Sequence, residues 1–223
     1  MNERKFSFIA CVNDEAMYEE SLLYLRHLEI PEGFEVDFIP IRGASSMTSG
    51  YEEGRRKSDA KYKIYIHQDV LVMQKDMLSR LLQCFREDEK VGLIGLAGCR
   101  QLPESFVWWE AEMHCLNVAH TSPKQAEYLS YFPQYVPEIE VQVVDGVLMA
   151  TQYEVPWRAD LFKAWHFYDI SQSLEFRRRG YKVMLPEQTD PWIIHCTSEK
   201  VLSSEDYGYW AKVCKEEYAE ALA

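Results

Sequence analysis

The sequence has few residues that break regular structure, and it has no long apolar run. Only 10 glycines and 9 prolines occur among 223 residues, which excludes collagen-like and low-complexity classes. No apolar run approaches the roughly 18 residues of a membrane span, and the apolar stretch near the N-terminus is too short for a signal peptide. We therefore expect a cytoplasmic protein with no transmembrane segment.

Basic residues are also in the minority. The chain has 24 Lys and Arg against 36 Asp and Glu, a formal net charge of −12. A negative field of this size disfavours nucleic acid and anionic membranes as partners. A polyanionic small molecule can still bind where a metal ion supplies positive charge locally.

Paired cysteines are absent as well. None of the six cysteines lies in a C-x-x-C pair, and a chain of this size without a secretory signal does not need disulfides. We expect buried free thiols. A structural zinc protein is the alternative, but the scattered cysteines and histidines lack zinc-ligand spacing. The cysteines are Cys11, Cys84, Cys99, Cys115, Cys196 and Cys214.

Several well-known catalytic motifs are missing. The sequence contains no G-x-G-x-x-G, no G-x-x-x-x-G-K-[ST], no H-E-x-x-H and no G-x-S-x-G. Redox dinucleotide enzymes, P-loop proteins, zincins and serine hydrolases therefore lose their usual sequence support.

What the sequence does have is a regular alternation of apolar strands and amphipathic helices over its first hundred residues. This alternation predicts an α/β fold with a mainly parallel central sheet flanked by helices. The expected strands are 5–12, 34–41, 62–66 and 91–97. The expected helices are 15–28, one that follows from the small, polar, Gly-bearing stretch 43–54 and ends near residue 59, and 75–85.

The alternation then stops, and we expect one domain over 1–223 with an irregular loop or lid at about 100–137. Two further strands, one further helix and a helical tail follow that segment. They are expected at 138–143 and 181–185, at 169–179, and at about 204–223 respectively.

Ligands of parallel α/β sheets gather beyond the carboxyl ends of the strands. The polar residues at these ends are Asn13, Asp14, Arg42, Gly43, His67, Gln68 and Asp69. Among them, Asp69 offers a hard oxygen ligand that suits Mg²⁺ or Mn²⁺ bridging phosphates. The alternative is that Asp69 only caps the turn after its strand.

Three candidates lie in the second half of the chain, each with a structural alternative. Asp169 begins a helix, where the helix dipole keeps a carboxylate available as a base, or it is an ordinary N-cap. His195 ends an apolar run and is a ligand, a core residue or a surface histidine. Asp145 and Gly146 interrupt an apolar strand, which indicates close backbone approach to a ligand or a plain turn.

Taken in order, these pieces resemble a family 2-type glycosyltransferase of the GT-A fold. The resemblance covers about residues 5–195 and is closest to a bacterial branch in which the metal motif reads His-Gln-Asp, here residues 67–69. The stretch 144–150 is similar to the family's acceptor-side strand. The stretch 165–169, with 173–183, resembles the helix that carries the inverting base.

The resemblance implies transfer of a sugar from a nucleotide-diphosphate sugar, a UDP-sugar in the first place, to a glycan or small-molecule acceptor, as in capsule or surface polysaccharide synthesis. Asp169 would be the base of an inverting reaction, and Asp69 and His195 would hold Mn²⁺ or Mg²⁺. The segment 100–137 would close over the substrates. The nucleotide sugar would contact Asn13, Asp14, Arg42, Gly43, His67, Gln68, Asp145 and Gly146.

Two other functions stay open at this stage. One is a catalytically degenerate GT-A domain that binds a sugar or a protein. The other is a sugar nucleotidyltransferase, which shares the general fold but needs a Gly-rich phosphate loop after its first strand. Residues 11–15, Cys-Val-Asn-Asp-Glu, do not form such a loop.

Overall fold

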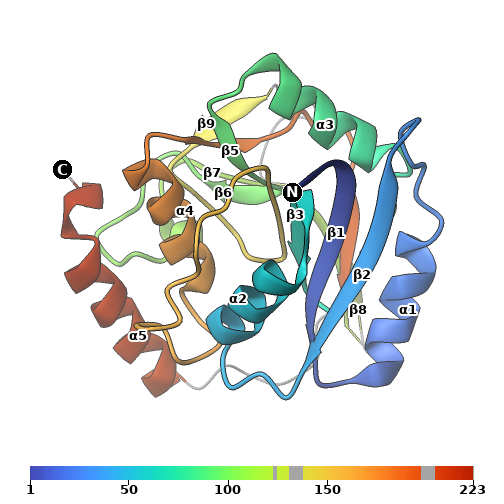
Figure 1. The fold of residues 1–223 in the computed structure, drawn as a ribbon. Helices are drawn as coiled ribbons and strands as arrows, with labels where there is room; N and C mark the ends of the chain where they lie inside the picture. The colour runs from blue at the N-terminus through green and yellow to red at the C-terminus, as the bar shows by residue number, and fades with distance from the viewer. Residues whose placement is uncertain (123–124, 131–137, 197–203, 223) are drawn as a thin grey trace.

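The computed structural model describes residues 1–122, 125–130, 138–196 and 204–222. Its main element is a seven-stranded sheet in the order β2-β1-β3-β11-β5-β12-β9 (Figure 1). The strands are β1 (Asn2–Val12), β2 (Glu35–Arg42), β3 (Ala60–Ile66), β5 (Val91–Gly95), β9 (Ile139–Val141), β11 (Leu148–Thr151) and β12 (Lys182–Leu185).

Parallel pairing sets the first part of this sheet. β1 is parallel to both β2 and β3, because the helices α1 (Glu15–Leu25) and α2 (Met47–Lys57) carry the chain back to the starting edge. The residues that follow these three strands therefore share one edge of the sheet, as the sequence predicts. The predicted strands and helices of this region are confirmed, with shorter helices.

Two strands enter the sheet in the opposite direction, which the sequence analysis did not predict. β11 is antiparallel to β3 and β5, and β9 is antiparallel to β12. Because β11 runs against β3, the residues before β11 lie beside those after β3. The amide of His67 donates to the carbonyl of Val147 at 3.2 Å, so the turn that holds Asp145 and Gly146 meets the end of β3.

Helices cover both faces of the sheet. The side chains of Phe6 and Phe8 share one core cluster with α1 and with α3 (Met77–Glu87), whereas Ile9 packs with α2 on the opposite face. A Cβ at Gly54 would overlap the Ile9 side chain. The glycine therefore lets α2 lie directly on β1.

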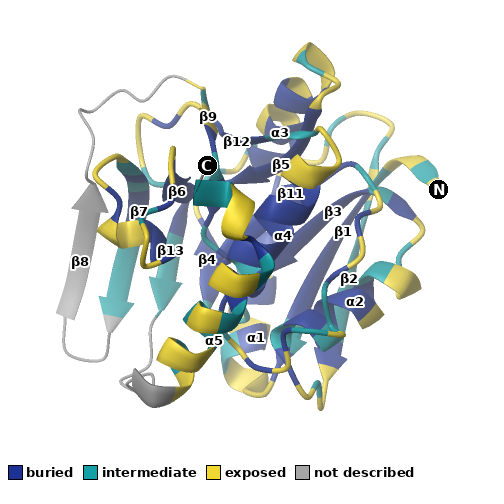
Figure 2. Cartoon of the chain, turned by 90° about the vertical axis from the view of Figure 1, so that its left-hand side faces the viewer, coloured by how far each residue is buried: buried dark blue, intermediate teal, exposed yellow. Residues whose placement is uncertain are grey.

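A second, six-stranded sheet stands beside the first. Its order is β10-β6-β7-β13-β4, with β8 paired to β7. Figure 2 shows β7 and β13 side by side, away from the main sheet. The strands are β4 (Val70–Val72), β6 (Ala97–Cys99), β7 (His114–Ser122), β8 (Gln125–Ser130), β10 (Val143–Val144) and β13 (Ile193–Cys196).

The prediction of an irregular segment at 100–137 is wrong for residues 114–122 and 125–130, which form the antiparallel hairpin of β7 and β8. Residues 100–113 are irregular apart from a short 3-10 helix (Trp108–Glu110), as the sequence predicts. Alternate β7 residues line a cavity, so the segment has the two-residue period of a strand. The sequence analysis did not recognise this period because histidine and asparagine are interspersed with the apolar residues. Residues 123–124 and 131–137 of the segment lie outside the described residues.

The C-terminal helix α5 (Ser204–Glu217) packs against α4 (Tyr168–Arg178), and a 3-10 turn (Ala219–Leu222) follows it. Tyr218 is fully buried, and its hydroxyl donates to Glu175 at 3.1 Å. The guanidinium of Arg178 binds the carboxylate of Glu217 at 2.9 Å. Figure 2 shows the outward side of α5 exposed. These contacts fix α5 at one wall of the candidate site described below.

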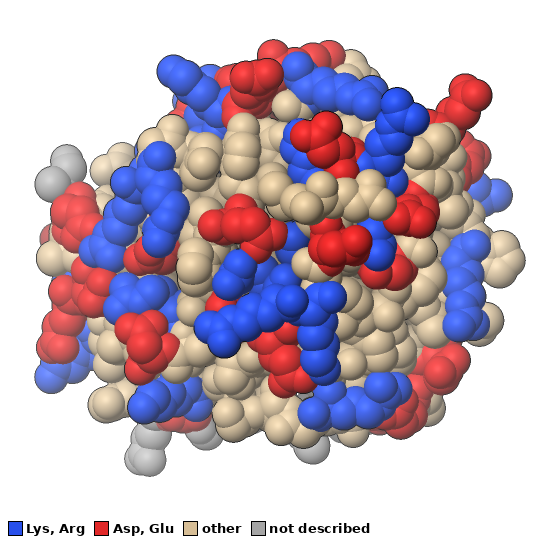
Figure 3. Space-filling view, viewed as in Figure 1, with Lys and Arg blue, Asp and Glu red and all other residues tan. Residues whose placement is uncertain are grey.

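Charges of both signs are interspersed over the face that carries α2 and α4 (Figure 3). Many of them pair: Glu52 accepts hydrogen bonds from Arg55 and Arg56, and also from the Trp157 amide at 3.1 Å. These pairs tie α2 to the strand-connecting segment around Trp157. All six cysteines lie in the described part of the chain and are free thiols. None of the described helices is long and apolar enough to cross a bilayer.

Candidate active site

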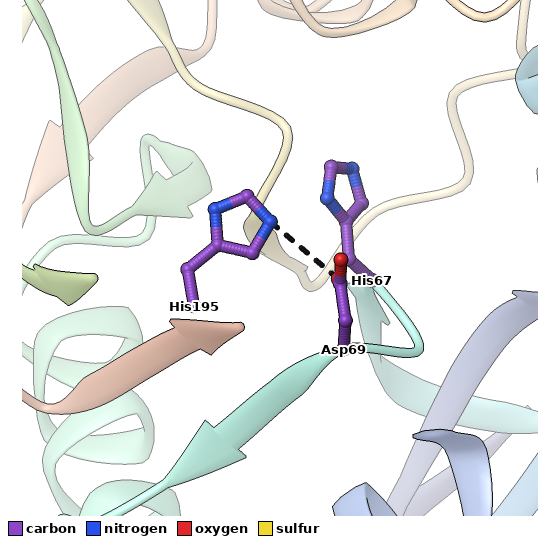
Figure 4. Close-up of side chains that lie close together, drawn as sticks. All are labelled: His67, Asp69 and His195. Carbon is purple, nitrogen blue, oxygen red and sulfur yellow. Dashed lines mark ion pairs between the residues drawn. The ribbon is translucent and has the colours of Figure 1, made fainter. Parts of the chain in front are cut away.

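Three ligand-type side chains meet where the two sheets join. His67 and Asp69 belong to the turn between β3 and β4, and His195 belongs to β13, which pairs antiparallel with β4. The Cys196 amide donates to the Asp69 carbonyl at 2.8 Å, which fixes this register. One potential ligand atom from each of the three side chains lies within 4.8 Å of the others (Figure 4).

The charges of this cluster depend on one another. Burial favours the neutral Asp69 carboxyl, but the hydrogen bond from His195 and the charges of His195 and His67 together outweigh burial and hold the pKa of Asp69 below its usual value. Burial opposes protonation of His195, yet Asp69 raises the pKa of His195. Burial, and then the charge of His195, lower the pKa of His67. The Nε2 of His195 and the Oδ1 of Asp69 are 3.4 Å apart.

This donor set fits a divalent metal ion. The Asp69 carboxylate suits Mg²⁺ or Mn²⁺, and the two imidazoles favour a transition metal over Mg²⁺, which prefers oxygen ligands. Sequence analysis selected Asp69 and His195 as ligands and assigned His67 to the nucleotide sugar; the structure brings all three together. The signal for His67 was its position two residues before Asp69, at the end of a buried strand.

A cavity of about 230 Å³ opens beside the cluster, at the carboxyl ends of β1 and β2. Asn13, Gly43, Gln68 and Trp165 line it, together with His67 and Asp69. Gln68 anchors this rim, since its side-chain carbonyl accepts the Asn13 amide at 2.8 Å. Gly43 has a φ of 70°, a left-handed conformation that favours glycine.

Two predicted nucleotide-sugar residues point elsewhere. The Asp14 side chain caps α1 by accepting the amides of Ala16 and Met17. The Arg42 side chain pairs with Glu15 at 2.6 Å on the exposed surface. Neither Asp14 nor Arg42 lines the described cavity beside the cluster.

The second group of predicted residues forms a carboxylate pair at the start of α4. Asp169 accepts the amides of Gly146 at 3.0 Å and Ile170 at 2.9 Å. Asp145 accepts the Val147 amide at 2.8 Å and the Trp108 indole N–H at 3.1 Å. Asp145, Gly146 and Asp169 are thus brought together as the sequence analysis expects.

The pair perturbs the titration of Asp169. Burial, and next the charge of Asp145, raise the pKa of Asp169 to about 7. The backbone N–H groups that Asp169 accepts lower its pKa and only partly offset this effect. A carboxylate poised near neutral pH is suited to act as a general base.

Tyr168 connects the carboxylate pair with the cluster of His67, Asp69 and His195, which we call the metal-type cluster. Its hydroxyl lies 2.5 Å from Nε2 of His67. The preceding residue, Phe167, is buried and has a φ of 60°, an uncommon conformation for a bulky residue that often marks functional sites. Sequence analysis assigned no role to Tyr168 or Trp108, although Tyr168 directly precedes the selected Asp169.

Replacement of Gly146 tests this close packing. A Cβ at Gly146 would overlap the Tyr168 hydroxyl, so Gly146→Ala should lower the free energy of unfolding by about 1–3 kcal/mol. Gly208→Ala is the control, because nothing lies within 4 Å of the added Cβ, and within α5 alanine should leave the free energy of unfolding unchanged or raise it by up to about 1 kcal/mol. Denaturant unfolding measures both variants, and an unchanged free energy of unfolding in Gly146→Ala would contradict the described contact.

A larger cavity of about 800 Å³ extends from the cluster on the side of the second sheet. His67, Asp69 and Trp165 line both cavities, whereas Asp145 and Asp169 line only the larger one. The described arrangement therefore has two compartments that meet at the metal-type cluster, with the carboxylate pair in the larger compartment.

Comparison with known proteins agrees with this architecture, an α/β sheet with two compartments that meet at a metal-type cluster. The chain belongs to the Glycosyltransferase like family, whose sequence pattern matches residues 7–218. The α/β GT-A fold expected from the sequence is thereby confirmed. No curated protein matches the chain.

Solved structures share this fold at low sequence identity. A mannosyltransferase of Pyrobaculum calidifontis, in complex with GDP-Man and Mn²⁺, is 14% identical with a TM-score of 0.53 over 94% of this chain and 60% of its own. GalNAc-T7, in a structure with UDP, GalNAc and Mn²⁺, is 10% identical with a TM-score of 0.62 over 88% of this chain and 44% of its own.

A third example is S. aureus TarS residues 1–349 with UDP-GlcNAc, 10% identical with a TM-score of 0.56 over 91% of this chain and 60% of TarS. The present chain thus spans between 44% and 60% of the lengths of these three proteins.

Proposed function

We propose that this chain transfers a sugar from a nucleotide-diphosphate sugar to an acceptor hydroxyl, with inversion and with a divalent metal. The observation that carries the proposal is the arrangement of a poised carboxylate, Asp169, in a cavity that shares the His67, Asp69 and His195 cluster with a second cavity. Three fold relatives hold nucleotides or nucleotide sugars in the same architecture, two of them with Mn²⁺.

The smaller cavity would take the nucleotide of the donor, with UDP as the first expectation. Asn13, Gly43 and Gln68 line that cavity and offer backbone and amide groups for hydrogen bonds to base and ribose. Asp69, His67 and His195 would hold the metal ion, which supplies positive charge for the leaving diphosphate when bound. Arg42 and Asp14 have no part in this assignment, because the Arg42 side chain pairs with Glu15 and the Asp14 side chain caps α1.

Asp169 would perform the proton transfer. In its ionised form it accepts the proton of the acceptor hydroxyl, and the oxygen then attacks the anomeric carbon from the face opposite the diphosphate. The bond between that carbon and the diphosphate oxygen breaks with inversion. The N–H groups of Gly146 and Ile170 hold the carboxylate oxygens in place, so its position is set before substrate binds. The family resemblance described in the sequence analysis, with its link to capsule or surface polysaccharide synthesis, suggests a glycan acceptor.

A panel of nucleotide sugars tests this function directly. We expect release of nucleoside diphosphate from one class of donor in the presence of Mn²⁺, and loss of that release on addition of EDTA. Donor binding without turnover with any acceptor would contradict catalysis and favour a degenerate binding domain.

The pH dependence of turnover follows from Asp169. Because burial and Asp145 raise the pKa of Asp169 to about 7, the base is protonated in acid and ionised in alkali. We expect kcat to fall about tenfold for each pH unit below 7 and to level off above pH 8. Steady-state rates from pH 5.5 to 9 measure this, and a flat profile below pH 7 would remove Asp169 from the role of base.

A further inference from the structure

Aromatic side chains form one wall of the larger cavity. Trp108, Trp109, Trp165 and Tyr207 all line it. Trp109 and Trp165 are 47% and 43% exposed, high values for side chains of this size. The wall is thus an exposed aromatic surface within a cavity that also holds Asp169.

The wall is held by its own contacts. Trp108 donates its indole N–H to Asp145 at 3.1 Å, and Trp109 meets Trp108 edge to face at 5.7 Å between ring centroids. Tyr207 lies 5.8 Å from Trp109 and 4.8 Å from Phe167. Because α5 is fixed to α4, this helix closes the wall with Tyr207. The aromatic faces are therefore positioned in advance and lose little entropy when a ligand binds.

The charge of the cavity limits what can bind there. Of the described residues that line it, none is Lys or Arg, whereas Asp69, Asp145 and Asp169 are all present; two of its five histidines, His67 and His195, belong to the metal-type cluster. An anionic acceptor would therefore meet carboxylates without a Lys or Arg to pair with, which disfavours its binding in a partly buried site. The positive charge of a bound divalent ion would already be matched by the diphosphate of the donor.

Aromatic faces and carboxylates together suit an uncharged sugar ring. The C–H groups on one face of a pyranose carry slight positive charge and pack against the negative face of an indole. The hydroxyls of the ring donate hydrogen bonds to carboxylate oxygens. The cavity volume of about 800 Å³ lies within the usual range for small-ligand sites, about 300–1,000 Å³, and accommodates more than one ring.

We propose that the acceptor is a neutral pyranoside whose terminal ring stacks on Trp109, and that the site rejects uronic acids and phosphorylated sugars. This inference rests on the proposed transferase function and names its acceptor class. Trp109 lines only the larger cavity, whereas Trp165 lines both. Trp109 is therefore the residue that separates acceptor binding from donor binding.

The test compares matched acceptors on the full chain with its donor and Mn²⁺. Alkyl glycosides of glucose, galactose and mannose are each paired with the corresponding uronic acid or 6-phosphate, which differ from the neutral sugar only at C6. We expect acceptor-stimulated release of nucleoside diphosphate with at least one neutral sugar, and at least about tenfold lower kcat/KM for its charged counterparts. Equal or better use of a charged counterpart would overturn the proposal.

Variants locate the effect. Trp109→Ala should raise the acceptor KM about tenfold with the donor KM unchanged, and Trp109→Phe should restore most of the loss. Tyr209→Ala is the control, because Tyr209 is 58% exposed on α5 and does not line the cavity. An unchanged acceptor KM in Trp109→Ala would overturn the stacking role. If the unsubstituted chain neither binds nor hydrolyses a nucleotide sugar, the result would instead contradict the transferase function itself.

Discussion

Asp169→Asn is expected to lower kcat by about 10³-fold, within the range of about 10²–10⁴-fold that general bases supply. The amide cannot take up the proton of the acceptor hydroxyl, although it keeps nearly the same shape. Donor affinity should stay within about threefold, because Asp169 lines only the larger cavity. Asp190→Asn is the control, since Asp190 is exposed and its carboxylate accepts a hydrogen bond from the neighbouring Thr189 hydroxyl at 3.3 Å.

Although Asp169→Asn should lower kcat, it should raise the stability of the folded protein at alkaline pH. The folded protein raises the pKa of Asp169 to about 7, so folding favours the protonated carboxyl. The stabilisation is complete below the unfolded pKa of about 3.9 and is lost as the pH rises through about 7. Asp169→Asn should therefore increase the free energy of unfolding at pH 8 by about 1 kcal/mol and leave it nearly unchanged at pH 4. Full turnover in this variant would rule out Asp169 as the base.

Asp69→Asn and His195→Ala are expected to weaken metal-dependent donor binding by at least about 100-fold, since even indirect partners of metal ligands contribute about 10–100-fold. Each substitution removes one member of a cluster whose ligand atoms lie within 4.8 Å. Titration of Mn²⁺ into the protein in the presence of nucleotide measures the loss.

His27→Ala is the matched control for the histidine variant, because His27 is exposed in the turn that follows α1 and its Nδ1 contacts the Leu23 carbonyl at 2.6 Å. It should bind Mn²⁺ and nucleotide as the parent does. Unchanged Mn²⁺ affinity in both Asp69→Asn and His195→Ala would contradict the assignment of the cluster as the metal site.

Much of the fold could be predicted because hydrophobic period dominates its first half. The strand β5, the second half of β1 and the end of β3 are apolar runs, and α3 has a clear apolar face with Leu78, Leu81 and Leu82 buried. The β7–β8 hairpin was missed because alternate β7 side chains face the larger cavity instead of a continuous core. His114 and His120 therefore occupy positions where the core of a sheet would have apolar residues.

The candidate site could be predicted in part, for a similar reason. Asp69, Asp145 and Asp169 stand next to strand ends or a helix start, and topology carries such positions to one place. The reversed direction of β11 could not be read from local sequence, although it is what sets Gly146 against Asp169. Arg42 shows the converse limit: it lies at a strand end, but its side chain turns to Glu15 on the surface.

The most direct test of the account is calorimetric titration of the chain with UDP-, GDP- and dTDP-sugars, each with and without Mn²⁺. We predict that one nucleotide class binds with Mn²⁺ and binds at least tenfold more weakly without it. The reason is that His67 and Asp69 of the proposed metal site line the cavity assigned to the nucleotide. That result would also name the donor class. Absence of binding to all three classes in the presence of Mn²⁺ would contradict the proposed function.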